Sequence, residues 1–219
     1  MDFRGAGRVQ ALSRLISSEK LADIACDHAY ISIGALLSGG ARRAVACDLN
    51  PGPLSRAARN LARFGLSERC ETRLGGGFSP LRPGECDQAV IAGVGGRLAA
   101  CIISEGLETA RAMSRLILQP QSETPDFRRF LHGAGFKILN ETALFDGGKY
   151  YNIIEAAQGA EPAYSDKEYL FGKILLDRKD PALAAHLAGR AEKMRLFPQT
   201  SAELRGKINF LEETLKWLM

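Results

Sequence analysis

The sequence predicts an α/β fold in which a mostly parallel, doubly wound sheet ends in an antiparallel hairpin and is followed by a small helical domain. Three observations lead to this prediction. Short apolar segments alternate with helical patterns up to about residue 156, a Gly-bearing turn joins the last two strand-like segments, and no strand-like segment follows residues 158–162. This order of elements is typical of a Rossmann-like sheet with an appended helical unit.

The alternating segments follow one another regularly. Apolar runs of strand length, bounded by Gly, Pro or Asp, occupy residues 21–26, 43–47, 70–74, 88–92 and 114–118. Helical spacing covers residues 32–37, 53–64, 97–107 and 126–134. The strand-like segments 136–145 and 150–156 flank Asp146-Gly147-Gly148-Lys149, which predicts a hairpin turn.

The C-terminal part of the chain is expected to be helical and coiled-coil-like, so we divide the chain into domains at residues 1–158 and 163–219. Ser165 and Glu168 have the spacing of a capping box, which predicts a helix reaching about residue 179. Asp180-Pro181 predicts a second helix start, and Pro198 a break. Two long helices packed as a helical hairpin explain the apolar spacing of Leu183, Leu187, Ala191 and Met194, and of Leu204, Ile208, Leu211, Leu215 and Leu218.

Composition describes an ordinary globular chain with a modest positive charge. Its 219 residues can bury one core and an appendage, and the net charge of +4 is compatible with a polyanionic partner without requiring one. The five cysteines and three histidines are scattered, so we expect no metal site, and buried thiols in a reducing cytoplasm. The sequence shows no signal segment and no apolar run of membrane-spanning length, so we expect a cytoplasmic protein without membrane contact.

The turn after the first strand favours S-adenosylmethionine over a dinucleotide. Ala25-Cys26-Asp27-His28 lacks the G-x-G-x-x-G pattern that lets backbone approach a pyrophosphate, which argues against a nicotinamide-dependent oxidoreductase. S-adenosylmethionine has no phosphate, and its amino group would pair with Asp23 or Asp27. Asp48, about 20 residues on, is placed to accept both ribose hydroxyls, although it could instead cap the following helix.

Glycine clusters follow the third and fourth strands, at the edge of the sheet where ligands bind. They allow close approach of backbone to a ligand, although tight turns alone would also explain them. We assign cofactor contacts to Arg8, Asp23, Ala25, Cys26, Asp27, Asp48, Leu49, Gly75, Gly76, Gly77, Ala92, Gly93 and Val94. We assign substrate contacts to Gly95, Gly96, Gln119, Pro120 and Tyr150. Arg8 belongs to an upstream helix that could fold over the cofactor, bind phosphate or lie on solvated surface.

Several segments, in their order and spacing, resemble the bacterial tRNA (adenine-22-N1)-methyltransferase family over nearly the whole chain. The most diagnostic are Asp27-His28-Ala29-Tyr30 and Gly93-x-Gly95-Gly96. The others include Leu74-Gly75-x-Gly77, Gln119-Pro120, Gly148-Lys149-Tyr150-Tyr151 and Phe171-Gly172-x-Ile174-Leu175-Leu176. The chain departs from the pattern at Ala25, where Gly is usual, at Ser32, where Pro is common, and at Gly76, where Asp or Asn would contact the cofactor adenine.

The resemblance implies methyl transfer from S-adenosylmethionine to N1 of the adenine at tRNA position 22, with the helical domain gripping the tRNA. N1 lies on the pairing edge, so the base must be unpaired or flipped. Methylation leaves a cationic ring, and we choose Asp27 as the carboxylate that stabilises it, with His28 as a second candidate. Asp27 could instead bind the cofactor amino group, and His28 could be structural.

Other functions stay open from the sequence. A methyltransferase of the same fold could act on another RNA, a protein or a small molecule, and a relative that lost the cofactor could bind RNA without catalysis. The heptad leucines are more often core than interface, so we expect a monomer or a weak homodimer.

Overall fold

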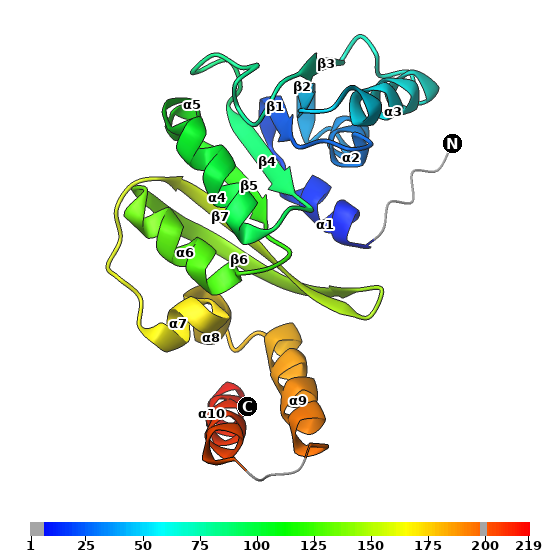
Figure 1. The fold of residues 1–219 in the computed structure, drawn as a ribbon. Coiled ribbons are helices and arrows are strands. Elements are labelled where there is room, and N and C mark those ends of the chain that lie inside the picture. The colour runs from blue at the N-terminus through cyan, green and yellow to red at the C-terminus, as the bar shows by residue number, and fades with distance from the viewer. Residues whose placement is uncertain (1–6, 198–200) are drawn as a thin grey trace.

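The computed structural model describes residues 7–197 and 201–219 (Figure 1). In this part of the chain seven strands form one sheet, in the order β3-β2-β1-β4-β5-β7-β6. They are β1 (Ser18–Ile24), β2 (Ala41–Asp48), β3 (Cys70–Leu74), β4 (Gln88–Ala92), β5 (Arg115–Gln119), β6 (Phe136–Asp146) and β7 (Lys149–Gln158). Strands β1 to β5 pair in parallel, whereas β7 runs antiparallel to both β5 and β6. The predicted mixed sheet with a terminal hairpin is confirmed.

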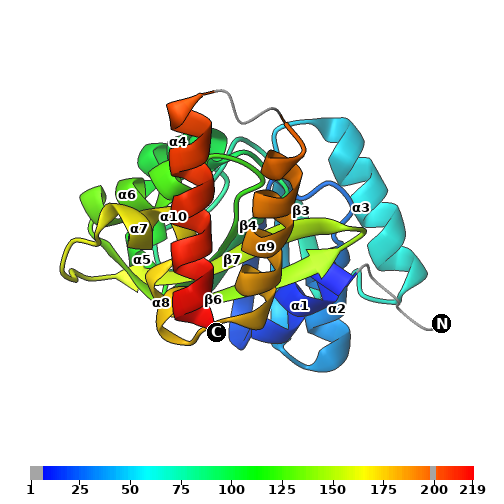
Figure 2. The same ribbon diagram turned by 90° about the horizontal axis from the view of Figure 1, so that it is seen from below.

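Helices cover both faces of the sheet (Figures 1 and 2). One face carries α1 (Gly7–Leu15), α2 (Tyr30–Ser38) and α3 (Pro51–Arg63), and the other carries α4 (Gly96–Glu105), α5 (Leu107–Ala112) and α6 (Thr124–Gly133). Strand β5 contributes to both cores, because Leu116 and Leu118 belong to one cluster and Ile117 to the other. Burial on both faces explains why such strands read as continuous apolar runs.

The first strand ends earlier than the apolar run 21–26 predicts. Ala25 has a φ of 57°, in the left-handed region, which an extended strand does not include. Strand β1 therefore stops at Ile24 and Cys26 lies in the turn. The helix predicted over residues 97–107 is also wrong at its end, because α4 stops at Glu105 and α5 begins after Gly106.

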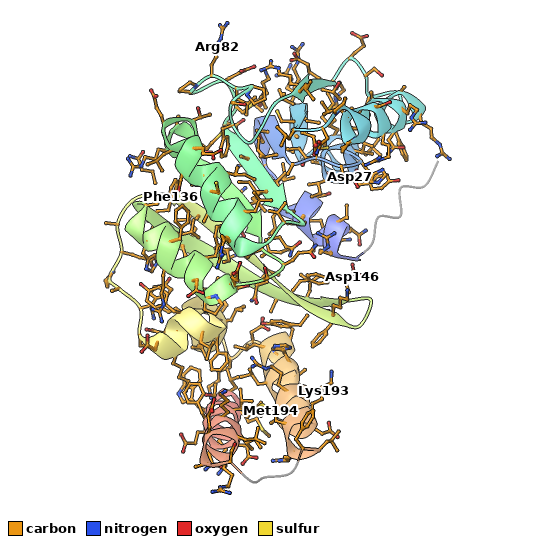
Figure 3. The ribbon with its side chains drawn as sticks, viewed as in Figure 1. Asp27, Arg82, Phe136, Asp146, Lys193 and Met194 are labelled. Carbon is orange, nitrogen blue, oxygen red and sulfur yellow. The ribbon has the colours of Figure 1, made fainter. Side chains whose placement is uncertain are left out.

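The hairpin between β6 and β7 forms where the sequence predicts it. Gly147 and Gly148 have φ values of 56° and 76°, and two consecutive residues with positive φ are what the tightest hairpin turns require. The two strands pair from Phe136 opposite Gln158 to Asp146 opposite Lys149. The hairpin tip therefore extends beyond the rest of the sheet and lies beside α1 (Figure 3).

Four helices follow the sheet. They are α7 (Asp166–Phe171), α8 (Lys173–Asp177), α9 (Pro181–Arg195) and α10 (Ala202–Leu218). The capping box at Ser165 and Glu168 is present, and the side chain of Asp180 caps α9. Helices α9 and α10 lie side by side over a separate apolar core, which confirms the helical hairpin (Figure 2).

The single helix predicted up to residue 179 is interrupted at Gly172, between α7 and α8. The helices α7 to α10, here called the helical tail, contact the rest of the fold at this point. Gly172 has a φ of 94°, and a Cβ there would come within 2.6 Å of the Glu141 carboxylate. Glu141 pairs with Arg128 at 2.7 Å, and both side chains are almost completely buried. Arg128 also donates to the Tyr169 carbonyl at 2.9 Å, and Glu141 accepts from the Ile174 amide at 3.2 Å. A buried ion pair between α6 and β6 thus binds the backbone of α7 and α8.

Other expectations concern the chain as a whole. Pro198 lies outside the described residues, and the division at residues 158 and 163 stays a prediction. Cys101 is exposed, whereas the other four cysteines are buried. No helix within the described ranges is long and apolar enough to span a membrane, and no group of His, Cys, Asp and Glu side chains there could hold a metal ion.

Candidate active site

A cavity of about 300 Å³ opens at the carboxyl ends of β1 and β4. The chain leaves β1 towards β2 and β3 and returns to β4, so the strand order reverses between these two neighbours. Parallel sheets of this kind bind ligands at such a switch point. Nine residues with a predicted role line the cavity: Arg8, Asp23, Ala25, Cys26, Asp27, His28, Ala92, Gly93 and Val94.

The turn after β1 is held tightly against its neighbours. Ala25 and Ala29 both have a φ of 57°. The Cys26 amide donates to the Cys47 carbonyl at 2.9 Å, and the Cys26 thiol accepts from the Ala29 amide at 3.1 Å. The left-handed geometry at Ala25 is the physical reason why Gly would be the less strained residue there, by about 1 kcal/mol.

Asp23 forms the buried acidic group of the cavity. Its side chain accepts hydrogen bonds from the Ser32 hydroxyl at 2.7 Å and from the Ser32 amide at 3.3 Å. Burial raises the pKa of Asp23 to about 6, against the lowering effect of these hydrogen bonds. A proline at position 32 could donate neither bond, so Ser32 gives the carboxylate of this chain two donors.

Asp27 lies at the mouth of the cavity, below α3 (Figure 3). Its carboxylate is paired with the Arg56 guanidinium, whose Nε donates at 3.2 Å, and with His28 Nε2 at 3.1 Å. The His28 ring stacks on Tyr30, with 5.3 Å between the ring centroids. Asp27 is more than half exposed, so it can meet a partner that approaches from solvent.

The residues predicted to hold the adenosine half of a cofactor gather at the ends of β2 and β3, outside the lining of the cavity. Asp48 accepts from the Asn50 amide at 2.8 Å and supports the turn before α3, but it does not cap this helix, whose N-cap residue is Asn50. Its backbone carbonyl accepts from the Gly75 amide at 2.9 Å, and a Cβ on Gly76 would lie 3.5 Å from the Leu49 side chain.

Close packing leaves little room for a side chain at two of the three glycines after β3, Gly75 and Gly77. A Cβ on Gly75 would come within 2.5 Å of Pro80, and one on Gly77 within 3.2 Å of Ile102. Gly76 has room for a side chain. Tight packing therefore explains the first and third glycines of this cluster without a ligand, and a role for the three in cofactor binding stays a prediction.

Arg8 is fixed by the sheet and does not lie on solvated surface. Its guanidinium donates to Gln119 Oε1 at 2.7 Å, and its amide donates to Asp146, at the hairpin tip, at 3.3 Å. These contacts hold α1 against the cavity. Gln119 itself is fully buried and does not line this cavity, so it acts on the site only through its hydrogen bond with Arg8.

A second cavity, of about 390 Å³, lies between the ends of the strands and the helical tail. Pro120 and Tyr150 line it, and Gln121 lines both cavities, so the two are neighbours. The Tyr150 ring stacks on the ring of His186, with 3.9 Å between centroids. Burial, with a smaller effect of neighbouring cations, lowers the pKa of His186 to about 4, so the ring is neutral at neutral pH.

The remaining predicted substrate residues, Gly95 and Gly96, open α4 and line neither of these two cavities. Gly96 is packed so closely that a Cβ would lie 2.6 Å from the Ser122 carbonyl. The segment Gln119-Pro120-Gln121 is expected from the sequence to shape the acceptor pocket from the end of the fifth strand, and Gln121 lines both cavities. Sequence reasoning assigns no role to Ser32, Arg56 or His186, which reach the site only through tertiary contacts.

Comparisons with known proteins agree with this geometry. A family model described as "Methyltransferase domain" matches residues 6–154. The tRNA (adenine(22)-N(1))-methyltransferase of Bacillus subtilis is 33% identical over 160 residues, which are 73% of this chain and 67% of that protein.

Solved structures match over almost the full length. A Streptococcus pneumoniae protein assigned as a tRNA (m1A22) methyltransferase, in complex with S-adenosyl-L-methionine, is 30% identical, with a TM-score of 0.87 and coverage of 97% of this chain and 100% of that one. The B. subtilis m1A22 tRNA methyltransferase is 25% identical, with a TM-score of 0.79 and coverage of 99% and 98%. The chain therefore belongs to the tRNA (adenine(22)-N(1))-methyltransferase family.

Proposed function

We propose that this protein transfers a methyl group from S-adenosylmethionine to N1 of adenine 22 in tRNA. The observation that carries the proposal is the cavity at the β1–β4 switch point, with the buried Asp23 carboxyl in its wall. Family membership supplies the substrate, because the curated B. subtilis relative bears that activity in its name.

The residues present fit this cofactor better than a dinucleotide. S-adenosylmethionine supplies a methyl group on a sulfonium and carries a cationic amino group when bound. Asp23 is an acid that burial alone would keep partly protonated, and a cation beside it favours its ionised form. We assign the amino group to Asp23. We assign the ribose hydroxyls to Asp48, whose Oδ1 already accepts from the Asn50 amide and whose Oδ2 is left for the ribose.

That assignment leaves Asp27 for the acceptor base. Asp27 lies at the exposed mouth of the cavity, whereas Asp23 is buried in its wall. A carboxylate at the mouth can stabilise the positive charge that forms on the adenine ring and can accept the N6 proton. His28, which contacts the other oxygen of Asp27, orients that carboxylate.

The target adenine would approach from the side of the second cavity. Gln121 lines both cavities, Pro120 lies next to it in the second, and Tyr150 with His186 presents a flat aromatic surface there. Aromatic surfaces stack readily on an unpaired base. Positioning of the base against the methyl group then provides most of the acceleration, since methyl transfer is a direct displacement.

The cellular setting follows from the proposed substrate. A tRNA-modifying enzyme works in the cytoplasm, and we propose that location. We also propose a monomer or a weak homodimer, because the leucines of α9 and α10 are largely occupied by the core between these helices.

The test is methylation of two tRNA transcripts that differ only at position 22. The transcript with adenine should accept one methyl group, located at N1 of that base by mass mapping, and the transcript with guanine should accept none. Equal incorporation into both would refute the assignment of position 22. Failure to bind S-adenosylmethionine in calorimetry, with tRNA binding intact, would identify a non-catalytic RNA-binding protein instead.

A further inference from the structure

Helix α3 presents a basic face beside the candidate active site. Its 13 residues include Arg56, Arg59 and Arg63 and contain no acidic residue. Residues three and four apart lie on the same face of a helix, so the three guanidinium groups line one side of α3. Arg59 and Arg63 are exposed and Arg56 is half-buried.

This face borders a hollow of about 330 Å³. The hollow is lined by His28, Tyr30, Arg56, Arg59, Asn60 and Arg63. His28 and Tyr30 also line the candidate active-site cavity, so the hollow and the cavity are neighbours. The amide of Asn60 donates to the His28 carbonyl at 3.0 Å, which fixes α3 against the turn after β1.

The positive charge of this face is only partly neutralised. Asp27 pairs with Arg56. Among the described residues no acidic side chain pairs with Arg59 or Arg63, and Arg59 donates only to the carbonyl of Ser55, at 3.4 Å.

The helical tail differs in this respect. Three of its cations are paired with acids of the tail itself: Lys173 with Asp177, Arg195 with Glu212, and Lys207 with Glu203. Pairing within the tail reduces the charge available to a polyanion, whereas Arg59 and Arg63 of α3 have no acidic partner among the described residues.

We propose that the α3 face, defined as Arg56, Arg59, Asn60 and Arg63, binds the phosphodiester backbone of the tRNA next to the target adenine. The inference rests on the proposed function. A guanidinium donates several hydrogen bonds in one plane and matches the geometry of a phosphate. The stacked pair of His28 and Tyr30 forms the wall of the hollow, against which a neighbouring base or sugar packs.

The test compares tRNA binding by the wild-type protein and the double variant Arg59→Gln/Arg63→Gln at several salt concentrations. For each phosphate that the variant no longer neutralises, the slope of log affinity against log salt should become shallower by about 0.7 to 0.9. The double variant should also bind about tenfold more weakly near 0.1 M salt. Affinity for S-adenosylmethionine should not change, since neither side chain lines the cofactor cavity.

Arg82 provides the matched control, because it is an exposed arginine on the β3–β4 loop, far from Asp27 (Figure 3). Arg82→Gln should keep the wild-type affinity and slope. Wild-type tRNA affinity and salt slope in the double variant Arg59→Gln/Arg63→Gln would overturn the inference. Failure of this inference can be told apart from failure of the proposed function. The salt slopes test the α3 face, whereas methylation of the two transcripts tests the preference for adenine 22, and either result can fail without the other.

A second measurement needs no variant. Phenylglyoxal modifies exposed arginines, and mass spectrometry can locate the adducts. Bound tRNA should protect Arg59 and Arg63 but not Arg82, and S-adenosylmethionine alone should protect none of them. Equal modification of all three with and without tRNA would also overturn the inference.

Discussion

Replacement of Asp23 by Asn should stabilise the cofactor-free protein at neutral pH while weakening its affinity for S-adenosylmethionine. The carboxyl of Asp23 is buried, and its pKa is raised from 3.8 to about 6. An acid whose pKa is higher in the folded protein than in the unfolded chain favours folding least when it is ionised. Its contribution is therefore fully present below pH 3.8 and is lost as the pH rises through 6.

The magnitude follows from the two pKa values. Each pH unit between them corresponds to about 1.4 kcal/mol, so the full loss is about 3 kcal/mol. About 2 kcal/mol of this falls between pH 4.5 and pH 7.5, given a folded pKa of about 6. The Asn side chain is neutral throughout and keeps an oxygen for the Ser32 hydroxyl, so it lacks this pH-dependent term.

The assay is urea unfolding of wild type and Asp23→Asn at pH 4.5, 6 and 7.5 without cofactor. The free energy of unfolding of the variant, relative to wild type, should rise by about 2 kcal/mol over this range. Glu68→Gln, at an exposed acid, is the control and should follow the wild-type curve. A stability difference between Asp23→Asn and wild type that does not vary with pH would refute the reasoning.

Three further predictions concern the cavity and the adenosine end of the site. Asp27→Asn should reduce methyl transfer to tRNA by at least about a hundredfold while cofactor affinity, measured by calorimetry, stays within about threefold; parallel losses of both would assign Asp27 to cofactor binding. Ala25→Gly should raise the unfolding free energy by up to about 1 kcal/mol, because φ at this position is 57°; a drop in thermal unfolding temperature would contradict this. Gly76→Asp should tighten cofactor binding several-fold, since a Cβ there meets only Leu49, at 3.5 Å, and the new carboxylate can accept from the adenine amine; unchanged or weaker binding would place the adenine elsewhere.

The sequence allowed the sheet, the hairpin and the helical tail to be predicted because each leaves a local pattern. Gly147 and Gly148 predict the turn, and Ser165 with Glu168 predicts the start of α7. Interruptions set by tertiary packing were missed. Nothing near Gly172 in the sequence indicates that a carboxylate from β6 would occupy the space beside it.

The same distinction applies to the site. The acids at positions 23 and 27 could be predicted because Asp23 lies near the end of the first strand and Asp27 in the turn after it, at the ligand edge of the sheet. Their partners could not, because Ser32 and Arg56 reach them from α2 and α3. RNA contacts were expected from the tail because of the family resemblance, whereas charge pairing, which only the structure gives, directs attention to α3.

The buried pair of Arg128 and Glu141 has a consequence for how the protein unfolds and for which fragments can exist. Helix α6 supplies Arg128 and strand β6 supplies Glu141, but the tail supplies hydrogen-bond partners to each, at the Tyr169 carbonyl and the Ile174 amide. Removal of the tail would expose the pair to solvent and replace two of its hydrogen bonds by bonds to water, and a hydrogen bond to a charged group contributes about 1.5 to 3 kcal/mol net. The two parts should therefore melt together in one transition, and a fragment ending near residue 160 should be much less stable than the intact chain.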